Sequence, residues 1–512
     1  MKIGFFEEPE LEFGVDKHVD IRYGIMNYGP VDFNHPLAPK EFHIGLVGTN
    51  ETVEGVHNWL EKCKGEIPAK ESHKPNLFPR FPGFEPETGF YSTVVMDPAL
   101  DRTVRQADLE AMKKIGSVNQ VIKEAVELFY DELKYIAEKA KVRVLVCALP
   151  QALLEHISTL STPVHIRSKK GKEEKFEKEN ETEEDDIAHE IAPAAIDEED
   201  DSDTEENLLN LHHMLKARAM GLNIPVQIIL PSTYDETKKR RDQFLLDFKG
   251  ATQDEATRAW NLHTALYYKA GGIPWRMVRS PSDFTTCYVG VSFYKTLDNS
   301  TLQTSIAHVF NERGEGMVVR GEQAKVSKDD RQVHLSSDAA QKLLEDALAQ
   351  YHKEHKTSPA RVVVHKSSKY NQDEIEGFTA ATKTYHIEMV DLISMDKSYT
   401  RLFRNGFYPP LRGTFISLDA RSHILYTRGS VHFFATYPGQ YVPRSLLFRC
   451  ESTDQTPAFL GKEILALTKM NWNNTQFDGS FPITMRPSRQ VGGILKYIGD
   501  NDPMAPYYRF YM

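Results

Sequence analysis

The pattern of apolar and polar positions divides the chain into two series of segments. In each series, short apolar runs typical of strands alternate with longer segments whose apolar positions recur at helical spacing. In the first series, the apolar runs at residues 43–49, 142–150 and 224–230 are short and rich in Val, Ile and Leu, as buried strands are. Residues 118–140 and 208–221 instead repeat apolar positions at helical spacing. This alternation predicts an α/β unit with a mostly parallel, Rossmann-like sheet, whose ligands bind at the carboxyl ends of the strands.

The second series begins near Pro281 and has a different order. A strand over 287–294 is followed by a hairpin over 302–321, a helix over 339–355 and a strand over 360–367. Further along, residues 413–419 and 431–438 are predicted as strands and residues 461–472 as a helix. Strand, hairpin, helix and strand is the order of an RNase H-like domain, a five-stranded mixed sheet flanked by helices. The sequence contains no repeat of fixed period and no Walker-type phosphate loop.

Composition indicates a cytoplasmic protein with large hydrophobic cores. Of the 512 residues, 40% are hydrophobic, and no run of about 18 apolar residues is present that would span a membrane. The first residues, MKIGFFEEPELEFG, carry acids where a signal or transit peptide needs basic and apolar regions. The four cysteines form no C-x-x-C pair, so neither a zinc site nor a disulfide framework is expected.

The net charge of −11 is concentrated in one acidic segment. Residues 173–206 contain 18 Asp and Glu against 2 Lys, a local charge of −16, whereas the remainder has 60 Lys and Arg against 55 Asp and Glu, or +5. The segment has too few large apolar residues to repay the entropy of ordering, so we expect a disordered insertion over 168–207. It could mimic nucleic acid or cover a basic groove, but a solvated loop is the simpler interpretation.

Residues suited to a 5′-phosphorylated nucleic-acid end follow the strand at 224–230. A tyrosine ring can stack on a terminal base, ammonium groups can neutralise the phosphate, and an amide can donate a hydrogen bond to it. The candidate ligands are Tyr234, Lys238, Lys239, Arg241, Gln253 and Lys269. A solvated basic turn followed by a glycine-capped helix, whose last lysine complements the helix dipole, would explain the same residues without a ligand.

In this order, the residues resemble the MID domain of Argonaute proteins, where a Y-x-x-x-K element, a glutamine and a lysine before Gly-Gly hold the guide's 5′-phosphate. Further motifs resemble the short prokaryotic Argonautes, which consist of MID and PIWI domains: LEFG, RYGIMNYGP, HIGLVGT, MLKARAM, QDEATRAWN, YYKAGGIPWR, RLFRNGFYPPLRGT, LTKMNWNN and FPIT. The resemblance implies a MID domain with a preceding N-terminal segment over 1–280, and a PIWI domain of RNase H-like fold over 281–512.

The resemblance also implies lost cleavage chemistry, because positions where cleaving Argonautes carry metal-binding acids hold other residues. Ser292 stands in the first strand, Ser367 follows a later strand, and Arg489 lies near the fourth position. A serine brings no negative charge to a metal ion, and an arginine would repel one. The acids around the usual glutamate position are Glu312, Glu315 and Glu322. One acid cannot hold the two Mg²⁺ ions that the cleavage reaction uses.

Short prokaryotic Argonautes bind a 5′-phosphorylated guide RNA and recognise complementary single-stranded DNA of invaders or plasmids. They act as an obligate heterodimer with an APAZ-domain protein carrying a TIR, sirtuin-like or nuclease effector, whose activation, sometimes with oligomerisation, stops growth or kills the cell. The resemblance further implies a Mg²⁺ ion at the guide's 5′-phosphate, held in part by the carboxylate of Met512. Two alternatives remain open: an autonomous guide-dependent nuclease, and an RNA-binding protein that uses no guide.

Overall fold

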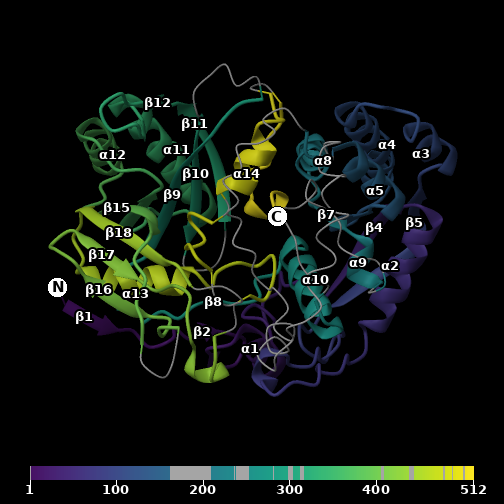
Figure 1. Ribbon diagram of the computed structural model, residues 1–512, viewed down its shortest axis with the longest axis horizontal. Helices are drawn as coiled ribbons and strands as arrows, with labels where there is room; N and C mark the ends of the chain where they lie inside the picture. The colour runs from purple at the N-terminus through teal and green to yellow at the C-terminus, as the bar shows by residue number, and fades with distance from the viewer. Residues whose placement is uncertain are drawn as a thin grey trace, which may run out of the picture.

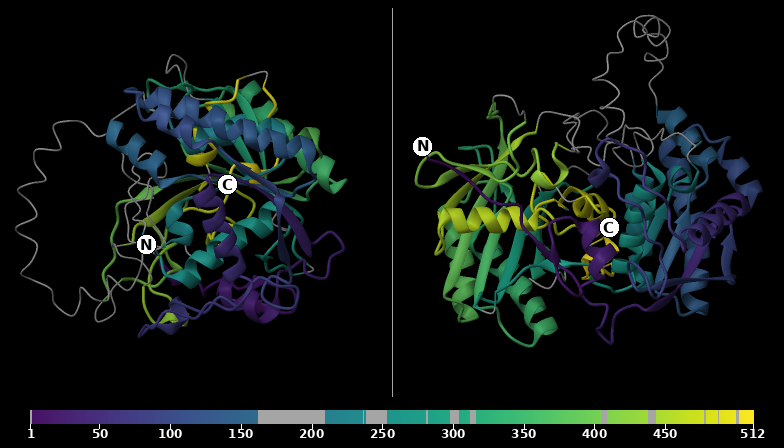
Figure 2. Two further views of the ribbon diagram at one scale, coloured as in Figure 1. Left: turned by 90° about the vertical axis from the view of Figure 1, so that its right-hand side faces the viewer. Right: turned by 90° about the horizontal axis from the view of Figure 1, so that it is seen from below.

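The two predicted series of strands form two separate sheets in the computed structural model (Figure 1). The chain end, marked C, lies between the two units in Figure 1 and again in the right view of Figure 2. The structure describes residues 2–161, 209–235, 237, 253–280, 282–297, 304–311, 316–404, 409–437, 443–476, 479–486, 488–499 and 502–512. The predicted acidic insertion and the candidate ligands Lys238, Lys239 and Arg241 lie outside these residues.

The first unit contains a four-stranded sheet with strand order β5-β4-β6-β7, in which all neighbours are parallel. Its strands are β4 (Glu41–Gly48), β5 (Thr93–Thr103), β6 (Val144–Ala148) and β7 (Val226–Ile229). Every residue of β6 is buried, as expected for a central strand covered on both faces. These features confirm the predicted parallel α/β unit. Within the described chain β7 pairs only with β6, so it forms an edge of this sheet.

The helices of the first unit lie on both sides of this sheet (Figure 1). They are α1 (Ile21–Tyr28), α2 (Asn50–Lys62), α3 (Gln106–Met112), α4 (Val118–Lys139), α5 (Gln151–Ser161), α8 (Leu211–Ala219), α9 (Pro231–Tyr234) and α10 (Glu255–Lys269). Helix α10 begins where the Asp254 side chain accepts a hydrogen bond from the Thr257 amide. It ends before Gly271, whose φ of +104° suits a glycine.

The second unit contains a nine-stranded mixed sheet with strand order β1-β16-β17-β18-β15-β14-β9-β10-β11. Its strands are β1 (Lys2–Phe5), β9 (Thr286–Tyr294), β10 (Thr304–Asn311), β11 (Gly316–Gln323), β14 (Arg361–Lys366), β15 (Met389–Ser398), β16 (Thr414–Ser417), β17 (Ser422–Leu425) and β18 (Ser445–Ser452). Strand β9 pairs antiparallel with β10 and parallel with β14. This order confirms the RNase H-like arrangement and extends it beyond five strands.

Among the described residues, four helices accompany the second sheet, and one of them reaches the first unit. They are α11 (Ser337–His355), α12 (Gln372–Thr384), α13 (Pro457–Leu467) and α14 (Ser488–Leu495). Helix α14 contacts β9 and β10 of the second unit and α8 of the first. The described residues of the two units also share one apolar core, in which Tyr268 of α10 stacks on Trp472 with ring centroids 5.0 Å apart.

The beginning of the chain lies on the second unit. Strand β1 pairs with β16, more than 400 residues away, and a small sheet joins β2 (Leu11–Glu12) to β3 (Lys17–His18) and β8 (Arg276–Met277). The short hairpin of β12 (Lys325–Val326) and β13 (Val333–His334) precedes α11. Among the described helices, none combines the length and apolar character needed to cross a bilayer.

The prediction of a strand over residues 431–438 is wrong for residues 431–437, which the structure describes. Residues His432–Phe434 form a 3₁₀ turn, and Ala435 has a φ of +53°, which breaks an extended backbone. The aromatic residues instead form a local cluster, in which Phe433 contacts the rings of His18 and Tyr23 edge to face. Local aromatic packing therefore overrides the β propensity of this stretch.

Candidate nucleic-acid interface

Lys269 is a buried cation at the end of α10. Its side chain is about 2% exposed, and its ammonium donates a hydrogen bond of 2.6 Å to Oε1 of Gln227 in β7. The amide of Gln227 is oriented for this contact because its Nε2 donates to the carbonyl oxygen of Ile228. Burial lowers the pKa of Lys269 from 10.5 to about 7. The predicted phosphate ligand therefore lies at the open edge of the first sheet.

Helix α8 brings two more buried basic groups to Lys269. His212 and Lys216 are four residues apart, so they lie on one face of the helix, and Lys216 is about 3% exposed. Burial and the neighbouring Lys269 lower the pKa of Lys216, while burial and the neighbouring Lys216 lower that of His212. Helix α8 also contacts β7, whose Gln227 binds Lys269, so the three groups lie on neighbouring elements. We call Lys216, Lys269, His212 and Gln227 the cation cluster.

Within the described chain, the cation cluster contains no acidic side chain. Neither Lys216 nor Lys269 forms an ion pair with any described residue, and the Nδ1 atom of His212 is buried without a hydrogen-bond partner there. A buried charge without a counter-charge is costly, and such groups shift their pKa toward the neutral form. An anion would remove this cost, so the cluster has the chemistry of a phosphate site.

Groups from the second unit and from the chain end lie beside the cation cluster. Lys496, which follows α14, lowers the pKa of His213, and burial contributes more strongly to a value of about 3. The turn Tyr508–Phe510 contacts α10, and Met512 is buried. The predicted role of the Met512 carboxylate stays a prediction. Among the described residues, no group of three or more His, Cys, Asp or Glu could by itself hold a metal ion.

Two other predicted ligands lie near the opposite end of α10. The ring of Tyr234 packs against Gly55 of α2, and Arg258 near the start of α10 donates to the carbonyl oxygens of Ser232 and Thr233. Gln253 accepts a hydrogen bond of 3.0 Å from Asn261. In the described chain no hydrogen bond or ring contact joins Tyr234 to Lys269, so the role of Tyr234 stays a prediction.

The sequence prediction missed Lys216, His212 and Gln227. A signal was present in the stretch LLNLHHMLKARAM, where His212 and Lys216 occupy the same helical face as Leu215 and Ala219, which are buried. A polar residue on the apolar face of a helix is unusual enough to mark a candidate site. Gln227 gave a weaker signal as one polar residue within a buried strand.

The second unit brings the two predicted serine positions side by side. Strands β9 and β14 are parallel with Val291 opposite Lys366, and the Ser367 amide donates a hydrogen bond of 3.2 Å to the Val291 carbonyl oxygen. Ser292 and Ser367 therefore meet at the carboxyl ends of adjacent strands. The Ser292 hydroxyl is buried and has no hydrogen-bond partner in the described chain.

Neither serine is a carboxylate, and the expected loss of cleavage chemistry stays a prediction. Two hydroxyl groups supply no negative charge to a pair of Mg²⁺ ions, which require carboxylates. Glu322 lies in β11, and the backbone of Arg489 lies in α14, while the side chain of Arg489 is outside the description. Glu312 and Glu315 are also outside it.

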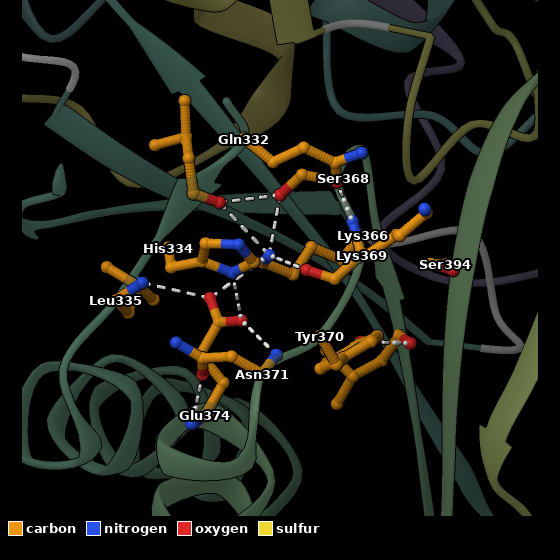
Figure 3. Close-up of polar contacts among 12 residues, drawn as sticks. Gln332, His334, Leu335, Lys366, Ser368, Lys369, Tyr370, Asn371, Glu374 and Ser394 are labelled. Carbon is orange, nitrogen blue, oxygen red and sulfur yellow. Dashed lines mark hydrogen bonds and ion pairs between the residues drawn. The ribbon is translucent and has the colours of Figure 1, made fainter. Parts of the chain in front are cut away.

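The buried Lys366, which precedes Ser367 in the chain, is surrounded by polar partners (Figure 3). The ammonium of Lys366 forms an ion pair of 3.0 Å with Glu374 and donates to the carbonyl oxygens of Val333 and Lys369. The carboxylate of Glu374 also accepts hydrogen bonds from the amides of Leu335 and Asn371 and contacts His334. These contacts join β13, β14 and the start of α12 around the segment that contains Ser367.

Comparison with known proteins identifies the fold. No family model and no curated protein matches the sequence. Among solved structures, Clostridium butyricum Argonaute bound to a guide DNA and a 19-mer target DNA has a TM-score of 0.62 at 14% identity, over 98% of this chain and 54% of that chain. Aa-Ago, the A. aeolicus Argonaute, with externally bound siRNA has a TM-score of 0.54 at 15% identity, over 100% and 56%. Drosophila Piwi has a TM-score of 0.56 at 11% identity, over 100% and 56%.

The chain therefore has the MID-PIWI fold of Argonaute proteins, as the sequence resemblance implied. It spans a little more than half the length of these structures, 54% to 56%. The first unit is the MID-like part, with the cation cluster at its edge, and the second is the PIWI-like part, with Ser292 and Ser367.

Proposed function

We propose that this protein holds the 5′-phosphorylated end of a guide RNA in the cation cluster and presents the guide for pairing with single-stranded DNA. The observation that carries the proposal is the burial of Lys216 and Lys269 without an acidic partner in the described chain. Two ammonium groups and an amide match the charge and the acceptors of a terminal phosphate, which carries nearly two negative charges at neutral pH.

In this account, the guide's phosphate supplies the counter-charge that the fold omits. Base pairing with the guide then selects the target, while the protein contacts the backbone and the shape of the duplex. A Mg²⁺ ion between the guide's phosphate and the Met512 carboxylate belongs to the same proposal, supported by the burial of Met512 at the chain end. Such an ion, when bound, would help to neutralise the phosphate's charge.

We further propose that the protein does not cut its target. Ser292 and Ser367 occupy adjacent strand ends where two-metal chemistry needs carboxylates. With guide, complementary DNA and Mg²⁺ or Mn²⁺, the purified chain should leave the target intact. Cleavage that survives removal of every other protein would favour the autonomous nuclease instead.

The sequence resemblance supports the last part of the proposal, an obligate partner that carries an APAZ domain and an effector. Target recognition would activate the effector in the cytoplasm, through oligomerisation where the effector requires it, and so give immunity by abortive infection. Copurification with the product of a neighbouring gene, followed by sequencing of the bound nucleic acid, tests this part. Bound RNA without a common 5′-phosphate would favour the binding protein that uses no guide.

The central experiment compares RNA guides with a 5′-phosphate and with a 5′-hydroxyl at one salt concentration. Lys216→Met and Lys269→Met each remove one charge-assisted contact while keeping the side-chain length. Each should weaken binding of the 5′-phosphate guide by about tenfold or more and affect the 5′-hydroxyl guide much less. Lys123→Met, at an exposed position of α4, is the matched control and should change neither affinity. Equal losses for both guides would exclude a phosphate site in the cluster.

A further inference from the structure

The segment after β15 exposes aromatic rings between basic residues. It reads KSYTRLFR over residues 397–404 and contains three cations and no acid. Tyr399 is 87% exposed and Phe403 is 77% exposed, more than any other aromatic side chain in the described chain. Arg401, between them, is also exposed. Exposed rings that cluster with cations are candidates for a binding surface.

The backbone beneath these rings is anchored to the second sheet. The Thr400 amide donates to the hydroxyl of Ser398, and the Ser445 hydroxyl donates to the Thr400 carbonyl oxygen. The Leu402 amide donates a hydrogen bond of 2.6 Å to the Tyr426 hydroxyl, and the Leu402 side chain packs on a small apolar cluster. The alternate residues thus hold the segment, which reduces the entropy cost of binding through Tyr399, Arg401 and Phe403.

Arg444 adds positive charge at the same end of the sheet. Ser398 pairs with Ser445 at the start of β18, which places the exposed Arg444 beside the segment. Residues 443–449 contain Arg444 and Arg449 and no acid. Exposed rings among cations, with no acid within residues 397–404 or 443–449, match the stacking and the charge that single-stranded nucleic acid requires.

We propose that residues 397–404 form a stacking platform for single-stranded nucleic acid, separate from the cation cluster. Bases of one strand would stack on Tyr399 and Phe403, while Arg401 and Arg444 neutralise the phosphates between them. The two rings are four residues apart, a reach of at most about 14 Å, which an extended strand can bridge. Stacking of this kind accepts any base, because every base has a flat face.

The test uses the full chain without guide and a fluorescent 5′-hydroxyl oligothymidine, which offers no terminal phosphate to the cation cluster. Tyr399→Ala and Phe403→Ala should each weaken binding by about fivefold or more. Phe284→Ala removes a half-exposed ring that precedes β9 and serves as the matched control, with no expected change. Arg401→Gln should also lower the salt dependence of binding by about 0.7 in the log-log slope.

Two results would overturn the platform. The first is oligothymidine binding by the Tyr399→Ala/Phe403→Ala variant that equals wild type and Phe284→Ala. The second is unchanged DNA binding together with loss of a copurifying protein, which would assign the rings to a protein partner. The outcome is independent of the guide proposal, since discrimination between 5′-phosphate and 5′-hydroxyl RNA is measured separately. Unchanged melting temperatures of the variants exclude unfolding as the cause of a loss.

Discussion

The cation cluster and the polar contacts around Lys366 and Glu374, here called the Lys366 network, both bury lysine side chains, yet they differ in their counter-charge. Lys366 faces Glu374 at 3.0 Å, whereas Lys216 and Lys269 have no acidic partner among the described residues. Burial lowers the pKa in each case, and for Lys366 the carboxylate of Glu374 opposes this effect. The comparison teaches that a paired buried lysine supports the fold, while an unpaired one indicates a ligand.

The largest expected change in stability comes from breaking the ion pair of Lys366 with Glu374. Lys366→Met leaves the buried Glu374 carboxylate without its cation and should lower the free energy of unfolding by about 3 to 5 kcal/mol. The double variant Lys366→Met/Glu374→Met should recover much of this loss, because both charges are removed together. Chemical denaturation measures both, with the exposed Lys369→Met as control. A double variant less stable than Lys366→Met would contradict the account of this network.

In the cation cluster, a lysine-to-methionine substitution should change the free energy of unfolding in the opposite direction. Without guide, folding must either deprotonate Lys216 and Lys269 or bury their charge without a partner. Lys216→Met and Lys269→Met remove this cost, so each should raise the free energy of unfolding by about 1 kcal/mol or more. Denaturation of the guide-free protein at neutral pH is the measurement. Destabilisation by several kcal/mol would mean that these lysines already have a counter-charge in the protein itself.

The pH dependence of stability also distinguishes the unpaired Lys269 from the paired Lys366. The pKa of Lys269 is about 7 in the folded protein and 10.5 ordinarily, so between these values the unfolded chain binds more protons. Stability should therefore rise with pH from about 7 to 10 because of this group. The difference between wild type and Lys269→Met, followed by thermal melting across this range, isolates its contribution. A pH-independent difference would contradict the lowered pKa.

The smallest expected effect concerns the chain end. A short tag after Met512 moves the terminal carboxylate away from its buried position and should weaken binding of the 5′-phosphate guide by about fivefold. Chelation of Mg²⁺ should weaken wild-type binding by a similar factor and have little further effect on the tagged protein. A tagged protein with wild-type affinity and the same response to chelation would remove Met512 from the site.

The features that could be predicted from the sequence are those that depend on local residue patterns. The strand and helix series, the β10-β11 hairpin and the position of Ser292 beside Ser367 all follow from periodicity, element order and family motifs. The pairing of β1 with β16 was not predictable, because it joins residues at opposite ends of the chain.

The cation cluster was predicted only in part for the same physical reason. Lys269 belongs to a recognisable motif, but Lys216 and Gln227 become neighbours of Lys269 only when α8, β7 and α10 pack together. The Lys366 network was missed because its acid, Glu374, occupies an ordinary capping position at the start of α12. Charge compensation depends on tertiary contacts that neither propensity nor spacing encodes.

Proton uptake on guide binding tests the central claim most directly. At pH 8 the unbound Lys269, with a pKa of about 7, is mostly neutral, and a bound phosphate dianion should restore its charge. Calorimetric titration in two buffers of different ionisation enthalpy should therefore show uptake of about one proton with a 5′-phosphate guide and almost none with a 5′-hydroxyl guide. Equal uptake for both guides, or none for either, would contradict a phosphate site in the cation cluster.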